Sequence, residues 1–405
     1  MNRIVSTFRS LKYKNFRLFF PGLIGCQIGL WIQNVAMGWL VYNLTKSPFS
    51  MGTIMFLNAV PLFIVTPFAG VIIDKFNRHK LLILVQVLFA IQAVLLAGVT
   101  LTGYIRVWNI ILLGFFLNII ASVDIPLRQS MFVFLVDDKK DLSNAISLNS
   151  TCFNMARLIG PAIAGVLTAA MSEGVCFLIS FFCFIPSVVL VPFMKIKEEK
   201  SEHVKNETVI EGLKEGFKYV KSDERIIVLL HILSVFCFIG MTYPMLMPIY
   251  TKETFSANAD ILGYLMAMAG FGALVSSLLI ASKNTIRGLK YFLCCGAILF
   301  SICFILLGFS SNVKFAIVVM FFLGLGMTSF ITSLNTLLQN IIDNETRGRV
   351  MSIHAICYLA TTSISSLFAG ITAEHTGINN TLIMFGCVLL LFSLYYLNKF
   401  RKLKF

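Results

Sequence analysis

Charged side chains are scarce in this chain. Only 13% of its 405 residues are Asp, Glu, Lys or Arg, whereas 58% are apolar. A soluble globular domain carries roughly 25% charged residues, so the deficit indicates a membrane protein. The apolar residues also gather into long runs, and a helix that crosses a bilayer needs about 20 of them.

Motifs for catalysis and metal binding are absent as well. The ten cysteines form no Cys-x-x-Cys pair, and no histidine stands at ligand spacing from any of them. We therefore expect no disulfide framework and no metal site, and we interpret the cysteines as small apolar packing residues. The sequence has no Walker loop and no nucleophile–His–acid set. It therefore predicts neither an enzyme nor a bound cofactor.

Twelve apolar runs are long enough to cross a membrane. Backbone polar groups in lipid must be satisfied within the chain, so we expect each run to be a helix. The predicted spans are 16–42, 50–73, 81–101, 107–133, 144–171, 173–194, 225–251, 258–282, 290–309, 313–341, 349–374 and 378–399. The sequence thus predicts an all-α integral membrane protein.

Basic residues are concentrated in alternate gaps between these runs. If the N-terminus is cytoplasmic, the cytoplasmic side holds 27 of the 33 Lys and Arg residues and the opposite side holds four. An excess of positive charge marks the cytoplasmic side, so both termini are predicted to be cytoplasmic. Topology therefore accounts for the formal charge of +14, and we expect no nucleic-acid partner. The other two basic residues, Arg128 and Arg157, lie in predicted spans.

The longest polar gap divides the chain into two halves. We predict an N-terminal six-helix bundle over 1–194, a cytoplasmic linker with a surface helix over 195–224, and a C-terminal six-helix bundle over 225–405. A weak internal repeat supports the division, because residues 138–148 align with residues 343–353 at an offset of 205. Two six-helix halves in parallel orientation are the architecture of one large class of transporters.

A short charged stretch stands between the second and third predicted spans. Asp74 precedes Arg78 by four residues, so the two side chains can pair across one helical turn. We expect a loop here that is too short to do more than turn at the membrane surface. Its charges must pair with each other, with a helix end or with a neighbouring helix. They either take part in gating or only set the topology.

The fourth predicted span carries a second pair of opposite charges. Asp124 and Arg128 are four residues apart and share one helical face. A charge in this position is costly unless it is paired, so we expect a mutual pair or a third partner, with Arg78 as a candidate. The pair serves either gating or structure alone. If a proton drives transport, Asp124 is the leading carrier by elimination, because the other acidic candidates lie at span boundaries.

Polar residues in several spans are candidates for lining an internal cavity. Gln27, Trp31 and Asn34 form one stripe in the first span, which suits either a cavity or helix packing with internal hydrogen bonds. Arg157 in the fifth span either pairs with a distant carboxylate or contacts an anion in a watery cavity. Further cavity candidates in later spans are Tyr243, Asn335 and Gln339.

The charged stretch resembles the signature loop of the major facilitator superfamily, with Gly70, Asp74 and Arg78 at the matching positions. In that superfamily the loop's Asp and Arg join an inter-helix charge network that helps to latch the two halves. The run Gly-Pro-Ala-Ile-Ala-Gly over 160–165 resembles part of the antiporter motif of the exporters, which adds Gly160, Pro161 and Gly165 as site candidates. Small residues of this kind let another helix approach closely.

Segments in both halves look like the enterobactin-exporter-like branch of this superfamily. They are 29–36, 39–45, 124–130, 142–150, 154–161 and 346–352. The branch includes siderophore and macrolide exporters. The resemblance implies the twelve-helix fold of the superfamily and a bacterial inner-membrane exporter powered by an ion gradient.

The leading hypothesis is a proton antiporter that exports an amphipathic small organic molecule by alternating access. A siderophore is favoured over a drug, because Arg157 favours an anion. We expect a monomer whose partners are a small-molecule substrate, the proton gradient and the lipid bilayer. Import of a nutrient by the same fold and a non-transporting membrane sensor are the alternatives.

Overall fold

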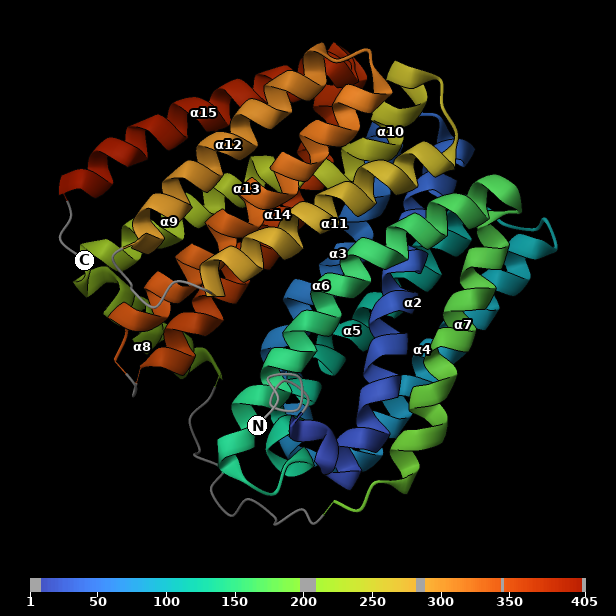
Figure 1. Cartoon of the computed structure of the whole chain (residues 1–405), viewed down its shortest axis with the longest axis vertical. Coiled ribbons are helices and arrows are strands. Elements are labelled where there is room, and N and C mark those ends of the chain that lie inside the picture. Colours follow the sequence, from blue (N-terminus) through green and yellow to red (C-terminus); the bar gives the residue numbers. More distant parts are fainter. Residues whose placement is uncertain (1–8, 197–208, 282–287, 344–345, 403–405) are drawn as a thin grey trace. The chain divides into compact units, whose positions relative to one another are not determined.

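The computed structural model describes residues 9–196, 209–281, 288–343 and 346–402 (Figure 1). These residues are almost entirely helical, and no strand occurs among them. Twelve helical spans in this part of the chain are long and apolar enough to cross a membrane. The predicted all-α membrane fold is confirmed.

The elements follow one another with short connections. In chain order they are η1 (Arg9–Lys12), α2 (Lys14–Thr45), α3 (Pro48–Lys75), α4 (Arg78–Leu101), α5 (Val107–Leu135), α6 (Lys139–Ala170), α7 (Glu173–Leu190), η2 (Val191–Phe193), α8 (Val209–Ser222), α9 (Glu224–Gly240), α10 (Tyr243–Phe255), α11 (Ala259–Ala281), α12 (Leu289–Phe309), α13 (Val313–Ile341), α14 (Arg347–Thr376) and α15 (Ile378–Lys402). Most of these ends lie within a few residues of the predicted ones.

Several helices begin with a polar capping residue outside the apolar run. Asn77 Oδ1 accepts the backbone N–H of Lys80 at 2.8 Å at the start of α4, and Asn312 Oδ1 accepts that of Lys314 at 2.9 Å at the start of α13. Such caps satisfy donors that the helix itself leaves unpaired. They let a helix start outside the hydrocarbon, which is why α4 begins earlier than its apolar run predicts. Asp138 caps α6, which also begins early, in the same way.

The seventh predicted span is wrong in one respect, because it is broken in two. Helix α9 ends at Gly240 and α10 starts at Tyr243, with Pro244 in its first turn. Proline is tolerated there because the first-turn N–H groups have no intrahelical partner, whereas inside a continuous helix it would remove a hydrogen bond. Thr242 Oγ1 donates to the carbonyl of Ile239 at 2.6 Å and satisfies one group at the break.

The chain divides into two compact units. Unit 1 comprises residues 1–44 and 60–205, and unit 2 comprises residues 45–59 and 206–405. Helix α8 lies in the segment predicted as a linker, and residues 197–208 of that segment lie outside the described residues.

In unit 1, helix α4 packs against α5 and α7, and α2 approaches α7 closely (Figure 1). A Cβ added at Gly29 would come within 3.1 Å of Cys183 Cβ and 3.2 Å of the carbonyl oxygen of Ser180. The Ser180 hydroxyl donates to the carbonyl of Gly29 at 3.0 Å. This contact between small residues brings two backbones together in a way that favours helix association in lipid.

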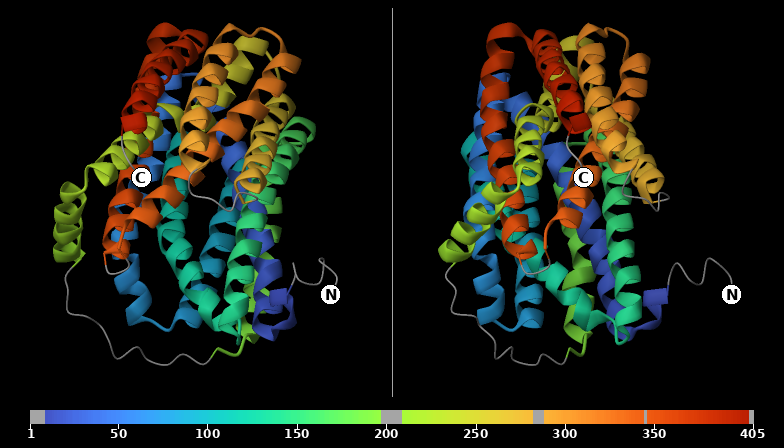
Figure 2. Two further views of the ribbon diagram at one scale, coloured as in Figure 1. Left: turned by 60° about the vertical axis from the view of Figure 1, so that its left-hand side comes forward. Right: turned by 90° about the vertical axis from the view of Figure 1, so that its left-hand side faces the viewer.

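In unit 2, helix α13 packs against α11 and α12, and α12 also packs against α15. Three aromatic rings fill the space between α9, α12 and α13. The ring of Phe236 stacks on Phe330 with centroids 3.9 Å apart and lies 5.0 Å from that of Phe300. Helix α8 is short, is joined to α9 by a turn, and packs against α14 (Figure 2).

The first part of α3 belongs to unit 2, where it packs against α14. A Cβ added at Gly52 would come 3.0 Å from the Cα of Gly370. Glu374 Oε2 accepts the backbone N–H of Phe49 at 3.0 Å and the hydroxyl of Ser47 at 2.9 Å. A carboxylate at this position stabilises the N-terminus of α3, because it meets unpaired backbone donors at the positive end of the helix.

Candidate functional site

The two charges on α5 are in direct contact. Arg128 Nε lies 2.7 Å from Asp124 Oδ2, and the two residues are only 6% and 4% exposed. Pro126 lies between them without ending the helix. The pairing removes part of the cost of placing either charge in an apolar interior.

Two further side chains join this ion pair from other helices. Gln86 Nε2 on α4 donates to Asp124 Oδ1 at 2.9 Å, and Arg128 Nη2 lies 2.6 Å from the Sγ of Cys26 on α2. Both Gln86 and Cys26 are buried. We call Cys26, Gln86, Asp124 and Arg128 the buried polar network. Within the described residues, Gln86 Oε1 has no hydrogen-bond partner.

A chain of glutamines makes a second link between the same three helices. Gln33 Nε2 on α2 donates to Gln92 Oε1 on α4 at 2.8 Å, and Gln92 Nε2 donates to the carbonyl of Leu113 on α5 at 3.2 Å. Neither Gln86 nor Gln92 was among the site residues predicted from the sequence. Each stands alone among the apolar residues of α4, and that isolation was the available signal.

The Asp74–Arg78 pair lies in a different environment. Arg78 Nη2 donates to Asp74 Oδ1 at 3.1 Å, and the Asp74 side chain is 54% exposed. The connection here is a turn, as expected, but it is shorter than the gap between the predicted spans, because α3 continues to Lys75 and α4 begins at Arg78. Arg78 also lies 5.5 Å from the ring centroid of Phe134. Gly70 lies within α3 and is exposed, and a Cβ added there would meet no described atom within 4 Å.

Arg157 on α6 lies against aromatic side chains. Its guanidinium carbon is 5.7 Å from the ring centroid of Trp31 on α2, a distance at which a cation is attracted to the ring face. The Trp31 ring in turn makes an edge contact with Phe153, with centroids 6.1 Å apart. We call Trp31, Phe153 and Arg157 the aromatic–arginine cluster. Gln27 is half-buried and Asn34 is exposed on the same helix as Trp31.

The antiporter-like motif lies one turn beyond this cluster. A Cβ at Gly160 would come 2.5 Å from the Cβ of Trp31, so glycine allows α6 to approach α2 at this point. Pro161 and Gly165 are buried, and α6 continues through both. The motif therefore lies at the contact that positions Trp31 beside Arg157.

The candidates in unit 2 do not come together in one site. Tyr243 is 2% exposed at the start of α10. Gln339 Nε2 donates to Asn335 Oδ1 at 3.1 Å along one face of α13. In the part of the chain that the structure describes, no group of three or more His, Cys, Asp or Glu side chains could hold a metal ion.

Comparison with known proteins gives a consistent result. Residues 5–404 match the family described as transmembrane secretion effector. The chain is 27% identical over 398 residues to the staphyloferrin A transporter of Staphylococcus aureus (strain NCTC 8325 / PS 47), covering 96% of this chain and 97% of the relative. It is 19% identical over 402 residues to macrolide efflux protein A of Streptococcus pyogenes, covering 97% and 99%.

Solved structures share the fold at low sequence identity. The crystal structure of the nucleoside transporter NupG matches with a TM-score of 0.74 at 13% identity, covering 96% of this chain and all of that one. The curated relatives are transporters, and the matched family covers nearly the whole chain. The chain therefore belongs to the transmembrane secretion effector family of transporters, within the major facilitator superfamily that its sequence motifs resemble.

Proposed function

We propose that this transporter is a secondary active exporter that moves an amphipathic small organic molecule out of the cell by alternating access, in exchange for protons. The observation that carries the proposal is the buried polar network, which holds a carboxylate and its counter-ion within the spanning part of unit 1. The family's description as a secretion effector supports the outward direction.

Asp124 is the proposed proton carrier. The buried carboxylates among the described residues are Asp124 and Asp141, and Asp141 lies in the first turn of α6. Ionised Asp124 pairs with Arg128. When Asp124 takes a proton, Arg128 becomes a buried cation without a counter-charge, which is strongly unfavourable. The helices around it must then rearrange, and that response would link proton binding to a change of conformation.

Gln86 is the proposed positioning residue for this step. Its amide donates to one carboxylate oxygen of Asp124, while Arg128 contacts the other. The unpartnered Gln86 Oε1 leaves an acceptor beside the carboxyl group. An amide offers both donor and acceptor atoms, so it suits both protonation states of Asp124.

The aromatic–arginine cluster is the proposed cargo contact. A guanidinium presents N–H donors in a plane that matches a carboxylate, and two aromatic rings beside it offer apolar area. Phe153 is 43% exposed, so part of the cluster is accessible. This combination fits an organic anion with an apolar body. We therefore favour a siderophore such as staphyloferrin A as cargo, with a drug second.

The distribution of basic residues supports the proposed location. It favours the bacterial cytoplasmic membrane with both termini in the cytoplasm, as 27 of the 33 Lys and Arg residues would then face that side. Each half would form a six-helix bundle of a monomeric transporter. In this orientation the starts of α6 and α14 face the cytoplasm.

Everted membrane vesicles containing the full chain test the proposal. With the vesicle interior acid, we expect accumulation of radiolabelled staphyloferrin A or erythromycin that collapses on adding a protonophore. Asp124→Asn should abolish accumulation, whereas the control Asp137→Asn, an exposed residue beyond the end of α5, should retain it. Accumulation only in right-side-out vesicles would indicate nutrient import, and no flux in either orientation would favour a sensor.

The cargo contact has its own test. Arg157→Ala should raise the KM for the carboxylate-rich staphyloferrin A by about tenfold, because a charge-assisted hydrogen bond is lost. The KM for erythromycin, which carries a positive charge, should change much less. Equal KM values for staphyloferrin A before and after the substitution would remove Arg157 as an anion contact.

A further inference from the structure

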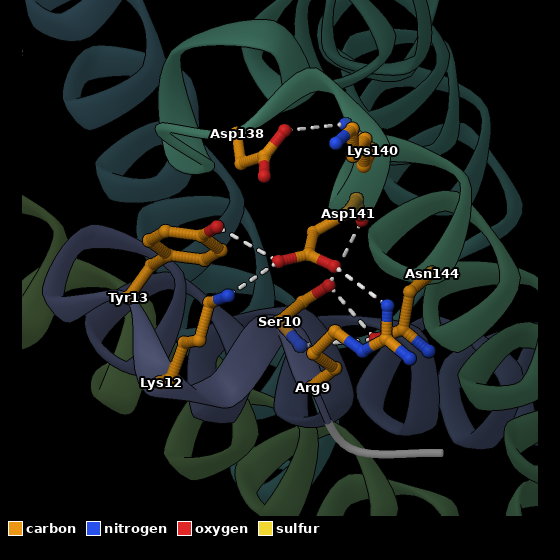
Figure 3. Close-up of polar contacts among 8 residues, drawn as sticks. All are labelled: Arg9, Ser10, Lys12, Tyr13, Asp138, Lys140, Asp141 and Asn144. Atoms are coloured by element: carbon orange, nitrogen blue, oxygen red, sulfur yellow. Dashed lines mark hydrogen bonds and ion pairs between the residues drawn. The ribbon is translucent and has the colours of Figure 1, made fainter. Parts of the chain in front are cut away.

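The segment that precedes the first spanning helix is bound to the start of α6 (Figure 3). Asp141 accepts from three donors: Arg9 Nη1 at 3.4 Å, Lys12 Nζ at 2.7 Å and the Tyr13 hydroxyl at 2.8 Å. The backbone N–H of Ser10 donates to Asn144 Oδ1 at 3.0 Å. We call these contacts the N-terminal clip.

The centre of the N-terminal clip is buried. Ser10 is 0% exposed and Asp141 is 2% exposed. The hydroxyl of Ser10 lies within hydrogen-bond distance of the carbonyl of Asp141 and of Asn144 Oδ1. Asp141 raises the pKa of the Lys12 ammonium above its ordinary value by accepting its hydrogen bond. Capping of α6 is left to Asp138, which accepts the N–H of Lys140, so Asp141 is available for the clip.

A corresponding arrangement occurs in unit 2. Helix α8 precedes α9, and its Glu215 forms an ion pair with Arg349 in the first turn of α14. The Tyr219 hydroxyl donates to Asp343 Oδ2 at 2.9 Å. A Cβ at Gly216 would come within 3.2 Å of both the Cβ and the carbonyl oxygen of Arg349, so α8 lies close against α14. We call these contacts the α8 clip.

The two clips match along the internal repeat. Ser10 contacts Asn144 and Glu215 contacts Arg349, and both members of the second pair lie 205 positions after those of the first. Each clip also contains a tyrosine that donates to an aspartate. In both units a segment just before a first spanning helix is bound to the start of a fifth one. The charges differ, because the segment supplies cations in unit 1 and a carboxylate in unit 2.

We propose that the two clips have the same role in the two halves. Each keeps the starts of the first and fifth helices of its half together throughout the transport cycle. In unit 1 these helices meet again at Gly160 and Trp31, about 28 Å further along α6 at 1.5 Å per residue. Helices held at two such distant points cannot splay at the end that carries the clip. In unit 2, α9 and α14 also pack together. The transport readout rests on the proposed function, whereas binding of the two segments does not.

Hydrogen exchange on the purified full chain tests the binding. Asp141→Asn should speed exchange of the Ser10 amide by about tenfold or more, because the contacts that Arg9, Lys12 and Tyr13 make with the charged Asp141 hold this segment in place. Exchange in α8 should not change. Glu215→Gln with Tyr219→Phe should speed exchange in α8 and leave exchange of the Ser10 amide unchanged. Lys12→Gln should loosen residues 9–13, whereas Lys14→Gln, the same change at an exposed neighbour, should not. Unchanged exchange in all clip variants would overturn the proposal.

Crosslinking tests whether the clips stay closed. Ser10→Cys with Asn144→Cys, and Glu215→Cys with Arg349→Cys, should form disulfides in the full chain under mild oxidation. Oxidised protein should transport erythromycin or staphyloferrin A at a rate within about twofold of the reduced protein, since a closed clip is already the working state. Single-cysteine variants under the same oxidant control for the native cysteines. Loss of transport that a reductant restores would overturn the proposal.

The two tests separate the possible failures. If the unsubstituted protein transports neither probe, the proposed function fails, while the exchange test still decides whether the segments are bound. If a paired-cysteine variant does not fold, Tyr13→Phe and Tyr219→Phe remove only hydroxyl groups. Each should loosen its own segment alone, and exchange that rises in both segments or in neither would contradict two separate clips.

Discussion

Corresponding positions in units 1 and 2 are filled by opposite chemistry. Helices α5 and α13 are both 29 residues long, and Asp124 and Phe330 lie at the same place in them, 17 residues after Val107 and Val313. Cys26 and Phe236 also correspond, each 12 residues after the start of a 32-residue span. In unit 1 the place holds a buried ion pair, and in unit 2 it holds stacked rings.

Because of this difference, we expect the two units to have different roles in transport. An ion pair in an apolar interior contributes little net stability, but it responds strongly to the loss of one charge. Stacked aromatic rings contribute through burial and ring geometry and do not respond to protons. We therefore expect proton-dependent steps to depend on unit 1 and the aromatic core of unit 2 to serve mainly as rigid structure.

The largest expected effect comes from breaking the ion pair. Arg128→Leu should destabilise the protein by about 3–5 kcal/mol, because Asp124 would remain as a buried charge without a partner. Asp124→Leu combined with Arg128→Leu should recover most of that loss. Thermal unfolding of the purified variants in detergent measures both. Additive losses in the double variant would mean that the two charges do not act as a pair.

A smaller effect is expected at Gln86. Gln86→Leu should cost about 2 kcal/mol, because hydrogen bonds to a charged group contribute roughly 1.5–3 kcal/mol, and it should also slow proton-driven transport. Gln92→Leu is the matched control on the same helix, since Gln92 contacts Gln33 and Leu113. Its unfolding temperature should fall too, with transport retained. Equal transport in the two variants would mean that Gln86 has no role in coupling transport to protons.

The aromatic side of the comparison predicts a different outcome. Phe330→Leu should lower stability by about 1–1.5 kcal/mol, through loss of ring stacking and imperfect repacking. Transport should keep its dependence on the proton gradient. The check is unfolding temperature together with vesicle transport at several imposed gradients. A variant with normal stability and altered proton dependence would contradict the assignment of a structural role to this core.

The smallest change in stability is expected at the exposed pair. Asp74→Asn should cost less than about 0.5 kcal/mol, because surface ion pairs contribute little. Transport should nevertheless fall severalfold if this pair helps to latch the halves, as the resemblance implies. Unfolding and vesicle transport measured on the same preparation distinguish the two effects. Full transport by Asp74→Asn would leave the pair as a topology signal alone.

The spans were predictable because a bilayer demands long apolar helices, and the ion pairs because i, i+4 spacing places two side chains on one face. Contacts between helices were not. Cys26 and Gln86 meet Asp124 and Arg128 only through packing, which no local pattern specifies. Trp31 and Arg157 were each selected, but their contact depends on close approach at Gly160.

Some features had local signals whose meaning only the packing supplied. Pro244 signals a helix start as readily as a bend, and the structure has it in the first turn of α10. Tyr243 beside it was a cavity candidate and is buried. The aligned segments 138–148 and 343–353 were recognised as a repeat, but Ser10 and Glu215, which bind to them, lie outside those two segments.

Residues 45–59 belong to unit 2, and this matters if the two halves are expressed as separate fragments. A fragment beginning at residue 206 would lack the stretch that carries Gly52, leaving Gly370 without its neighbour and Glu374 without its two donors from that stretch, the Phe49 N–H and the Ser47 hydroxyl. The complementary fragment would expose the same stretch. Separately produced halves should therefore be insoluble or short-lived, whereas co-production should allow the N-terminal piece to complete its partner.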